Sequence, residues 1–155
     1  MMKRLLITAL VAVALSSCSA PLSLYYWGDG RLKMNSNTTS YEDYGYKSYI
    51  KRTPEATCAL IVTYEDMVKH PGGTRQVPPP GICAEYAYLL IQPYTASIFA
   101  EHASTAQKAI FEGQTDYVAF FSNYAGELFE KEMELYPESQ AFIKPLIEKI
   151  RNRGN

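Results

Sequence analysis

Three cysteines and two histidines carry the most distinctive side-chain chemistry of this 155-residue sequence. Cys58 and Cys83, in the body of the chain, can form a disulfide in an oxidising compartment, or they can be two small buried hydrophobes on neighbouring helices. A thiol enzyme would need one of these two as a thiolate within hydrogen-bond reach of His70 or His102, with a third group to orient the imidazole. No local sequence pattern supplies that arrangement. The remaining cysteine, Cys18, lies near the N-terminus in a different context.

The same residues show no metal-ligand spacing with one another. His102 borders an alanine-rich stripe, and a single helical histidine without a partner cysteine or carboxylate pattern is mostly structural. We therefore expect no catalytic residues, no metal and no cofactor, and we interpret the chain as a protein that is not an enzyme.

The N-terminal residues are organised like a bacterial export signal. Lys3 and Arg4 precede an apolar run, 5–15, that is too short to span a bilayer as a permanent helix. The sequence Leu15-Ser16-Ser17-Cys18 resembles the end of a lipoprotein signal, in which the cysteine is diacylated on sulfur, becomes the first mature residue and is acylated again on its amine. This resemblance implies a signal peptide at 1–17 and fatty acyl chains such as palmitate on Cys18. The alternative is an ordinary secretory signal whose cleavage motif is built from residues 17–20.

Removing the signal leaves about 138 residues, which fits one domain with a single core. The loss of Lys3 and Arg4 leaves 13 basic against 16 acidic side chains, a formal charge of −3, which argues against nucleic acid as a partner. No second apolar run is long enough to cross a membrane, so we expect bilayer contact only through acylated Cys18. Ser19 follows the cysteine in place of Asp, which resembles the outer-membrane sorting pattern of enterobacterial lipoproteins.

We divide the mature chain into a lipid-anchored tether with an aromatic segment, 18–40, and a helical domain, 41–155. Tyr25, Tyr26 and Trp27 can lie in the membrane interface, contact a protein partner or cap the core. We favour the core, because the only Trp of a small domain is seldom left to solvent.

The helical domain shows apolar residues at the spacing of single-faced helices and no alternating run that is typical of a strand. The turn and cap signals predict about six helices, at 41–52, 54–69, 82–91, 94–111 and 116–136 and after Pro137. Phe142 and Ile143 belong to the apolar residues of the last helix, and Gly126 in the fifth suggests a close helix crossing. The predicted fold is all-α, built from antiparallel helical hairpins.

Two resemblances extend this prediction. Ala125, Phe129 and Pro137 have the spacing of the second helix of a tetratricopeptide unit, which implies tetratricopeptide-like hairpins. The chain as a whole resembles a family of small bacterial lipoproteins known as domain of unknown function 4810. The matching pieces are the signal ending in Cys18, Leu24-Tyr25-Tyr26-Trp27-Gly28-Asp29, Tyr46-Lys47-Ser48-Tyr49-Ile50-Lys51, Val77-Pro78-Pro79-Pro80-Gly81, Phe129-Glu130-Lys131-Glu132, Leu135-Tyr136-Pro137-Glu138-Ser139 and Phe142. The resemblance implies helical hairpins without an established activity, often encoded beside a curli-type secretion-channel lipoprotein.

The leading interpretation is an outer-membrane lipoprotein that faces the periplasm and acts as an adaptor or accessory subunit of an envelope complex. Thirteen tyrosines support it, because tyrosine supplies amphipathic contact area, although a tyrosine-rich core is an equal alternative. The candidate partner-binding residues are Tyr25, Tyr26, Trp27, Tyr86 and Tyr124. A second interpretation is a helical pocket, lined by Tyr86 and Tyr124, for a peptide or glycan fragment; a thiol enzyme is a remote third.

Overall fold

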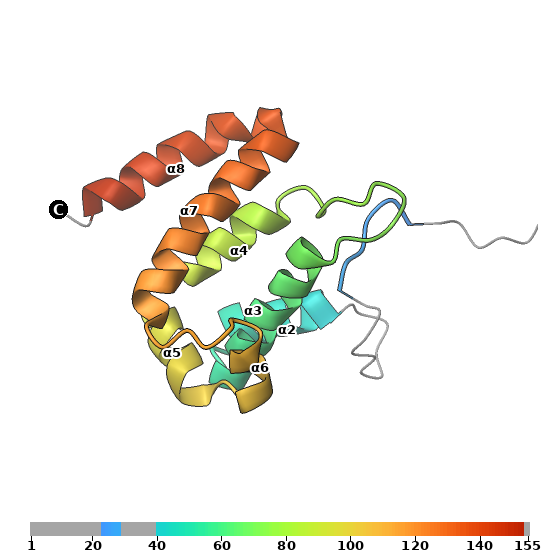
Figure 1. Ribbon diagram of the computed structural model, residues 1–155. Coiled ribbons are helices and arrows are strands. Elements are labelled where there is room, and N and C mark those ends of the chain that lie inside the picture. Colours follow the sequence, from blue (N-terminus) through green and yellow to red (C-terminus); the bar gives the residue numbers. More distant parts are fainter. Residues whose placement is uncertain (1–22, 29–39, 154–155) are drawn as a thin grey trace, which may run out of the picture.

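The computed structural model describes residues 23–28 and 40–153, which contain helices and no strand. The prediction of an all-α fold with about six helices is confirmed. In chain order the elements are α2 (Ser40–Tyr49), α3 (Pro54–Lys69), α4 (Ile82–Leu90), α5 (Thr95–His102), α6 (Thr105–Ala109), α7 (Tyr117–Leu135), the 3-10 turn η1 (Pro137–Ser139) and α8 (Gln140–Arg153) (Figure 1). None of these helices is long and apolar enough to cross a membrane.

Helices α3, α4 and α7 build the centre of the molecule. In Figure 1 α4 lies alongside α7, and α3 packs against both α2 and α4. Their facing sides are apolar and almost fully buried, as at Leu60, Ile82 and Leu128. Burying these single-faced helices against one another removes apolar surface from water and is the main stabilising contribution to the fold.

The predicted helix at 94–111 is wrong, because the chain breaks at Ala103 and Ser104 into α5 and α6. The Ser104 side chain accepts a hydrogen bond from the Gln107 amide, and the Gln107 side chain accepts one from the Ser104 amide. This capping box satisfies two amide groups at the start of a new helix and so favours the break. As a result Ala106 and Ile110 are exposed.

The C-terminal hairpin differs from expectation at two positions. A Cβ added at Gly126 would meet nothing within 4 Å, so the close helix crossing predicted there is not found among the described residues. Phe142 is 81% exposed, whereas Ile143 is buried, because α8 packs on the side of the helix that carries Ile143 and Ile147. Helix α8 continues through Pro145 without interruption.

The segment 23–28 is fixed to the loop after α3. The amides of Thr74 and Arg75 donate to the carbonyls of Ser23 and Leu24 at 3.0 and 3.1 Å. Gly73, at a φ of +73°, lies so close that a Cβ there would be 2.5 Å from the Leu24 carbonyl oxygen, so only glycine fits. The N-terminal segment is therefore part of the folded body.

The proline-rich spacer before α4 packs against the end of α7. Pro78 and Pro79 are buried, and the Tyr136 hydroxyl donates to the Pro78 carbonyl at 2.6 Å. The Gly81 amide donates to Oε1 of Glu132 at 2.7 Å. These contacts hold the spacer as a rigid connector between helices, since prolines cannot donate backbone hydrogen bonds of their own.

Candidate functional site

The two cysteines of the helical domain are buried free thiols, so the disulfide considered for Cys58 and Cys83 is absent from this structure. Both are small buried side chains of the hydrophobic core, which was the alternative to a disulfide. Burial raises the pKa of Cys58 to about 11 and that of Cys83 to about 12. A thiol held protonated in this way is a poor nucleophile at neutral pH. Cys18 and the signal peptide lie outside the described residues.

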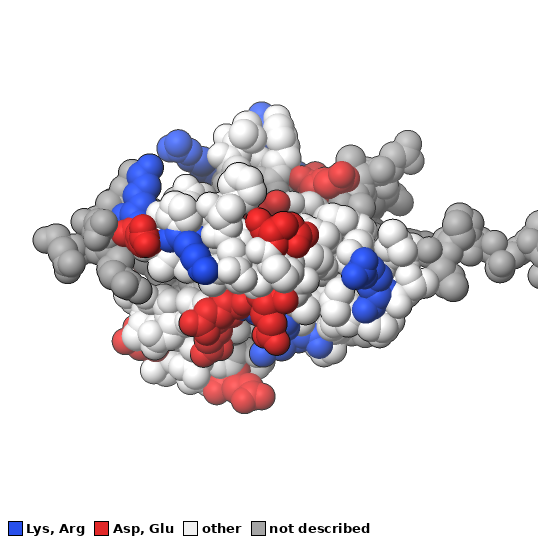
Figure 2. Space-filling model, turned by 90° about the horizontal axis from the view of Figure 1, so that it is seen from above, with Lys and Arg blue, Asp and Glu red and all other residues white. Residues whose placement is uncertain are grey.

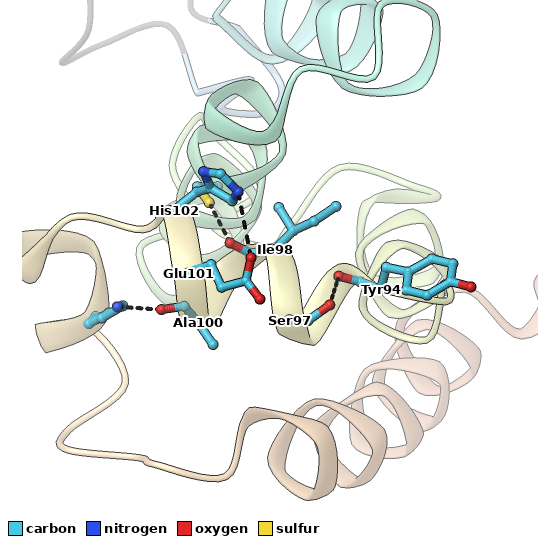
Figure 3. A network of polar contacts seen from close by, with 8 residues as sticks. Tyr94, Ser97, Ile98, Ala100, Glu101 and His102 are labelled. Atoms are coloured by element: carbon cyan, nitrogen blue, oxygen red, sulfur yellow. Dashed lines mark hydrogen bonds and ion pairs between the residues drawn. The ribbon is translucent and has the colours of Figure 1, made fainter.

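The histidines pair with carboxylates. His70 contacts Asp66 at 3.2 Å, one turn back on α3, and His102 lies 3.9 Å from its neighbour Glu101 on α5 (Figure 3). The Cys58 thiol faces the Ile98 carbonyl at 3.8 Å. Within residues 23–28 and 40–153 no thiol bonds to an imidazole, and no three His, Cys, Asp or Glu side chains are grouped to hold a metal ion.

Iodoacetamide at pH 8 should alkylate Cys58 and Cys83 of the folded protein at least about 100-fold more slowly than in urea, because a pKa of about 11 or 12 leaves little thiolate and burial blocks access. Mass spectrometry of the peptides that contain each cysteine gives the rates. Equal rates in the folded and unfolded protein would contradict the buried placement.

The candidate partner-binding aromatic residues separate into two groups. Trp27, expected in the core, is 37% exposed, and Tyr25 and Tyr26 are half-buried beside it, so these three remain accessible on the surface. Tyr86 is fully buried and cannot contact a partner directly, which corrects that prediction. Tyr124 is half-buried, and the Lys69 ammonium lies over its ring at 5.5 Å.

Four rings from four different helices form a continuous line through the domain, which we call the tyrosine row: Tyr41, Tyr64, Tyr86 and Tyr124. Neighbouring ring centroids are 5.6, 5.4 and 5.8 Å apart. Burial is the largest cause of the raised pKa of every hydroxyl in the row, and neighbouring carboxylates raise each pKa further. Much of the tyrosine excess therefore serves the core.

Two carboxylates accept the hydroxyls of the tyrosine row in pairs. Oε2 of Glu65 accepts from Tyr86 at 3.0 Å and from Tyr124 at 2.9 Å. Oε2 of Glu85 accepts from Tyr64 at 3.0 Å and from Tyr41. Glu65 is only 6% exposed, so these hydrogen bonds are its compensation for lost hydration.

A cavity of about 500 Å³ lies beside this network, where the C-terminal half of α3 meets the N-terminal segment and the turn after α6. Its wall contains the carboxylates of Glu65, Asp66 and Glu112 together with the basic side chain of Lys69. The remaining lining residues are Tyr26, Gly28, Val62, Thr63, His70 and Ile110. The cavity thus combines an apolar wall with a surplus of negative charge.

An apolar groove follows the side of α7 that faces α8. It consists of two adjoining hollows of about 410 and 500 Å³, which share Ile91, Ser122 and Ile150. The first extends toward Pro93, Tyr94 and Val118. The second extends along Ala125, Gly126, Phe129, Met133 and Ile147. Neither Tyr86 nor Tyr124 lines this groove.

Sequence reasoning missed the two buried glutamates, although a signal existed. Glu65 lies four residues after Ile61 and three before Val68, so it falls on the apolar face of α3. Glu132 similarly falls four residues after Leu128 on α7. A carboxylate at such a position must find hydrogen-bond donors inside the protein, so the spacing alone indicates a buried polar contact.

Comparisons of the chain with protein-family models, with curated proteins and with solved structures gave no match.

Proposed function

We propose that this protein is a lipoprotein held on the outer membrane by acyl chains on Cys18, and that it faces the periplasm as an adaptor or accessory subunit of a cell-envelope complex. Its partner is a protein that lays an amphipathic helix into the groove between α7 and α8. The single observation that carries the proposal is this groove, which is apolar and continuous over two hollows of about 410 and 500 Å³.

The chemistry of the groove selects a helix over an extended segment. Its lining is dominated by side chains such as Ile91, Phe129 and Ile150, which offer no hydrogen bonds to a backbone. An extended peptide would leave its amides and carbonyls unpaired there, whereas a helix satisfies them internally. Ser122 and Gly126 are four residues apart on α7, and their small side chains leave room for a second helix to approach.

The position of the anchor supports the same interpretation. Because Ser23 is bonded to the folded body, the chain from Cys18 to Ser23 can reach at most about 18 Å. In Figure 1 the segment at 23–28 lies on the right, and the C-terminal end of α8, which lines the groove, lies on the left. The α8 residue that lines the groove, Ile150, therefore lies near the end of the molecule opposite the segment at 23–28.

The surface suits a protein partner. On the face seen in Figure 2 acidic and basic side chains are interspersed with a large uncharged area. Rim positions beside the groove expose apolar side chains, with Val118 at 71% and Tyr94 at 79%. The resemblance to domain of unknown function 4810 supports an envelope assembly, including one built around a curli-type secretion channel, as the source of the partner.

Photo-crosslinking in intact cells tests the proposal. A benzophenone amino acid at the exposed Ser122, inside the groove, should give a discrete crosslink to another envelope protein, and the same group at the exposed Glu134, outside it, should not. Repeated failure of the Ser122 probe, or a crosslink only to a second copy of this chain, would overturn the proposal.

Filling the groove should reduce that crosslink at least tenfold. Gly126→Trp places an indole where a Cβ meets nothing within 4 Å, so the fold should tolerate it while the partner helix is displaced. The matched control, Gly126→Ala, should raise the unfolding free energy by about 1 kcal/mol, because alanine favours the helix, and should leave the crosslink intact. Urea unfolding of both variants checks their stability.

A further inference from the structure

The cavity beside α3 is separate from the groove. Its lining includes Glu65, whose carboxylate has one oxygen available to accept a hydrogen bond from a ligand. Oε2 of Glu65 accepts both tyrosine hydroxyls, whereas Oε1 accepts no hydrogen bond from residues 23–28 or 40–153. The residue is 6% exposed, and Glu65 lines the cavity. Because Tyr86 and Tyr124 both bond Oε2, Oε1 is the carboxylate oxygen that remains free to accept a hydrogen bond from a ligand.

The neighbouring charges do not neutralise this oxygen. The ammonium of Lys69, on the same wall, lies over the Tyr124 ring at 5.5 Å and forms no ion pair within 4.0 Å among the described residues. Asp66 is already engaged, because it accepts from the Tyr26 hydroxyl at 2.9 Å and contacts His70 at 3.2 Å. With three carboxylates against one lysine, the cavity favours a cation.

The apolar part of the wall defines the rest of the ligand. Val62 and Ile110 line the cavity, and Ile110 is 42% exposed, which places it toward the mouth. An alkyl chain that enters past Ile110 can bury its methylenes against these side chains while its charged end reaches Glu65. A volume of about 500 Å³ is ample for a chain of several carbons.

We propose that this cavity binds a protonated primary alkylamine, whose ammonium donates to Oε1 of Glu65 and whose alkyl chain lies against Val62 and Ile110. The inference goes beyond the adaptor proposal, because it concerns another face of the molecule and another class of ligand. The ammonium can come from a lysine side chain of a peptide or from a free alkylamine, and the test separates these two sources.

Ligand binding to the purified full chain in mild detergent, followed by NMR, provides the test. Hexylamine should bind, and hexanol, which has the same chain without the charge, should bind at least tenfold more weakly because it cannot form the charge-assisted hydrogen bond. Acetyl-Ala-Lys-Ala-amide represents the protein source, and the tighter of the two amines identifies the natural source. Equal affinity for hexylamine and hexanol would overturn the proposal.

Three substitutions locate the binding. Glu65→Gln keeps the side-chain shape and an acceptor for the tyrosines, and should weaken hexylamine binding roughly tenfold or more. Ile110→Lys places a competing ammonium at the exposed mouth without disturbing the core, and should abolish binding. Ile50→Lys, at a 66% exposed position that does not line the cavity, adds the same charge and should change nothing. Hexylamine binding that survives both Glu65→Gln and Ile110→Lys would refute the assignment.

Discussion

Raising the pH to between 11 and 12 should unfold this protein in one cooperative step. The cause is the tyrosine row, whose hydroxyls have a pKa raised above the ordinary value of 10.0, mainly by burial and further by nearby carboxylates. A raised pKa in the folded state gives stability that is complete below the pKa of the unfolded chain and is lost as the pH rises above it. Unfolding releases the phenol protons, so alkali favours the unfolded chain.

The two most deeply buried tyrosines of the row give a lower bound on the stability that is lost at high pH. Tyr64 and Tyr86 are at most 1% exposed. Each costs about 1.4 kcal/mol of stability per pH unit above 10, so together they remove roughly 3 kcal/mol at pH 11 and roughly 5 kcal/mol at pH 12. A domain of this size has only about 5 to 15 kcal/mol of stability, and Tyr41 and Tyr124 add to the loss.

Exposed tyrosines contribute an early part of the absorbance change at 295 nm, and the remaining part, from the row, should occur together with the loss of the far-UV circular dichroism signal. Tyr64→Phe should reduce the slope of unfolding free energy against pH, measured by urea titration above pH 10.5, by about 1.4 kcal/mol per pH unit. Tyr88→Phe is the matched control and should leave the slope unchanged, because this side chain is 45% exposed and lies outside the row. Ionisation of every tyrosine before any loss of helix would contradict the buried row.

Helix boundaries were predictable wherever the chain carries its own stop signal. Pro54 at the first turn and His70-Pro71-Gly72-Gly73 after the last turn delimit α3 at 54 and 69, as predicted. The break between α5 and α6 had a local signal too, Ser104 followed three residues later by Gln107, but the alanine-rich spacing around it suggested a single helix. Here a capping box prevailed over apolar periodicity.

The placement of aromatic side chains was not predictable in the same way. A tyrosine has an apolar ring and a polar tip, so periodicity alone cannot distinguish a core position from an interface. Tyr86 can be buried because a carboxylate of the adjacent helix, Glu65, accepts a hydrogen bond from its hydroxyl. Phe142 is exposed because α8 docks through Ile143 and Ile147. Both outcomes depend on contacts between distant segments, which a single sequence does not contain.

Replacing Glu132 by alanine should lower the unfolding free energy by about 2 to 4 kcal/mol. This side chain is 2% exposed, and its Oε1 accepts from the Gly81 amide at the start of α4. Alanine would leave that amide without its acceptor and would leave a cavity beside the first turn of the helix. Urea or thermal unfolding at pH 7 measures the loss, with the exposed Glu134→Ala, two residues further along α7, as the control.

Glu132→Gln separates the hydrogen bond from the charge. Burial raises the pKa of Glu132 above its ordinary 4.5, although the amides of Gly81, Ala84 and Cys83 act in the opposite direction. Within the part of the chain that the structure describes, Oε2 has no hydrogen-bond partner. A carboxyl group with a raised pKa stabilises the fold below pH 4.5, and this contribution is lost as the pH rises through the folded-state pKa. Glutamine keeps an acceptor for Gly81 and does not titrate.

The stability of the wild-type protein relative to Glu132→Gln should therefore fall between pH 4.5 and pH 7, and the two should lie within about 1 kcal/mol of each other at pH 7. Glu134→Gln, which removes the same charge from an exposed position, should show no such trend. A stability difference that instead grows with pH would mean that the charged form of Glu132 is the one favoured by the fold. The first turn of α4 would then hold a carboxylate as its cap, and the cost of burying that charge would be smaller than its interaction with the helix amides.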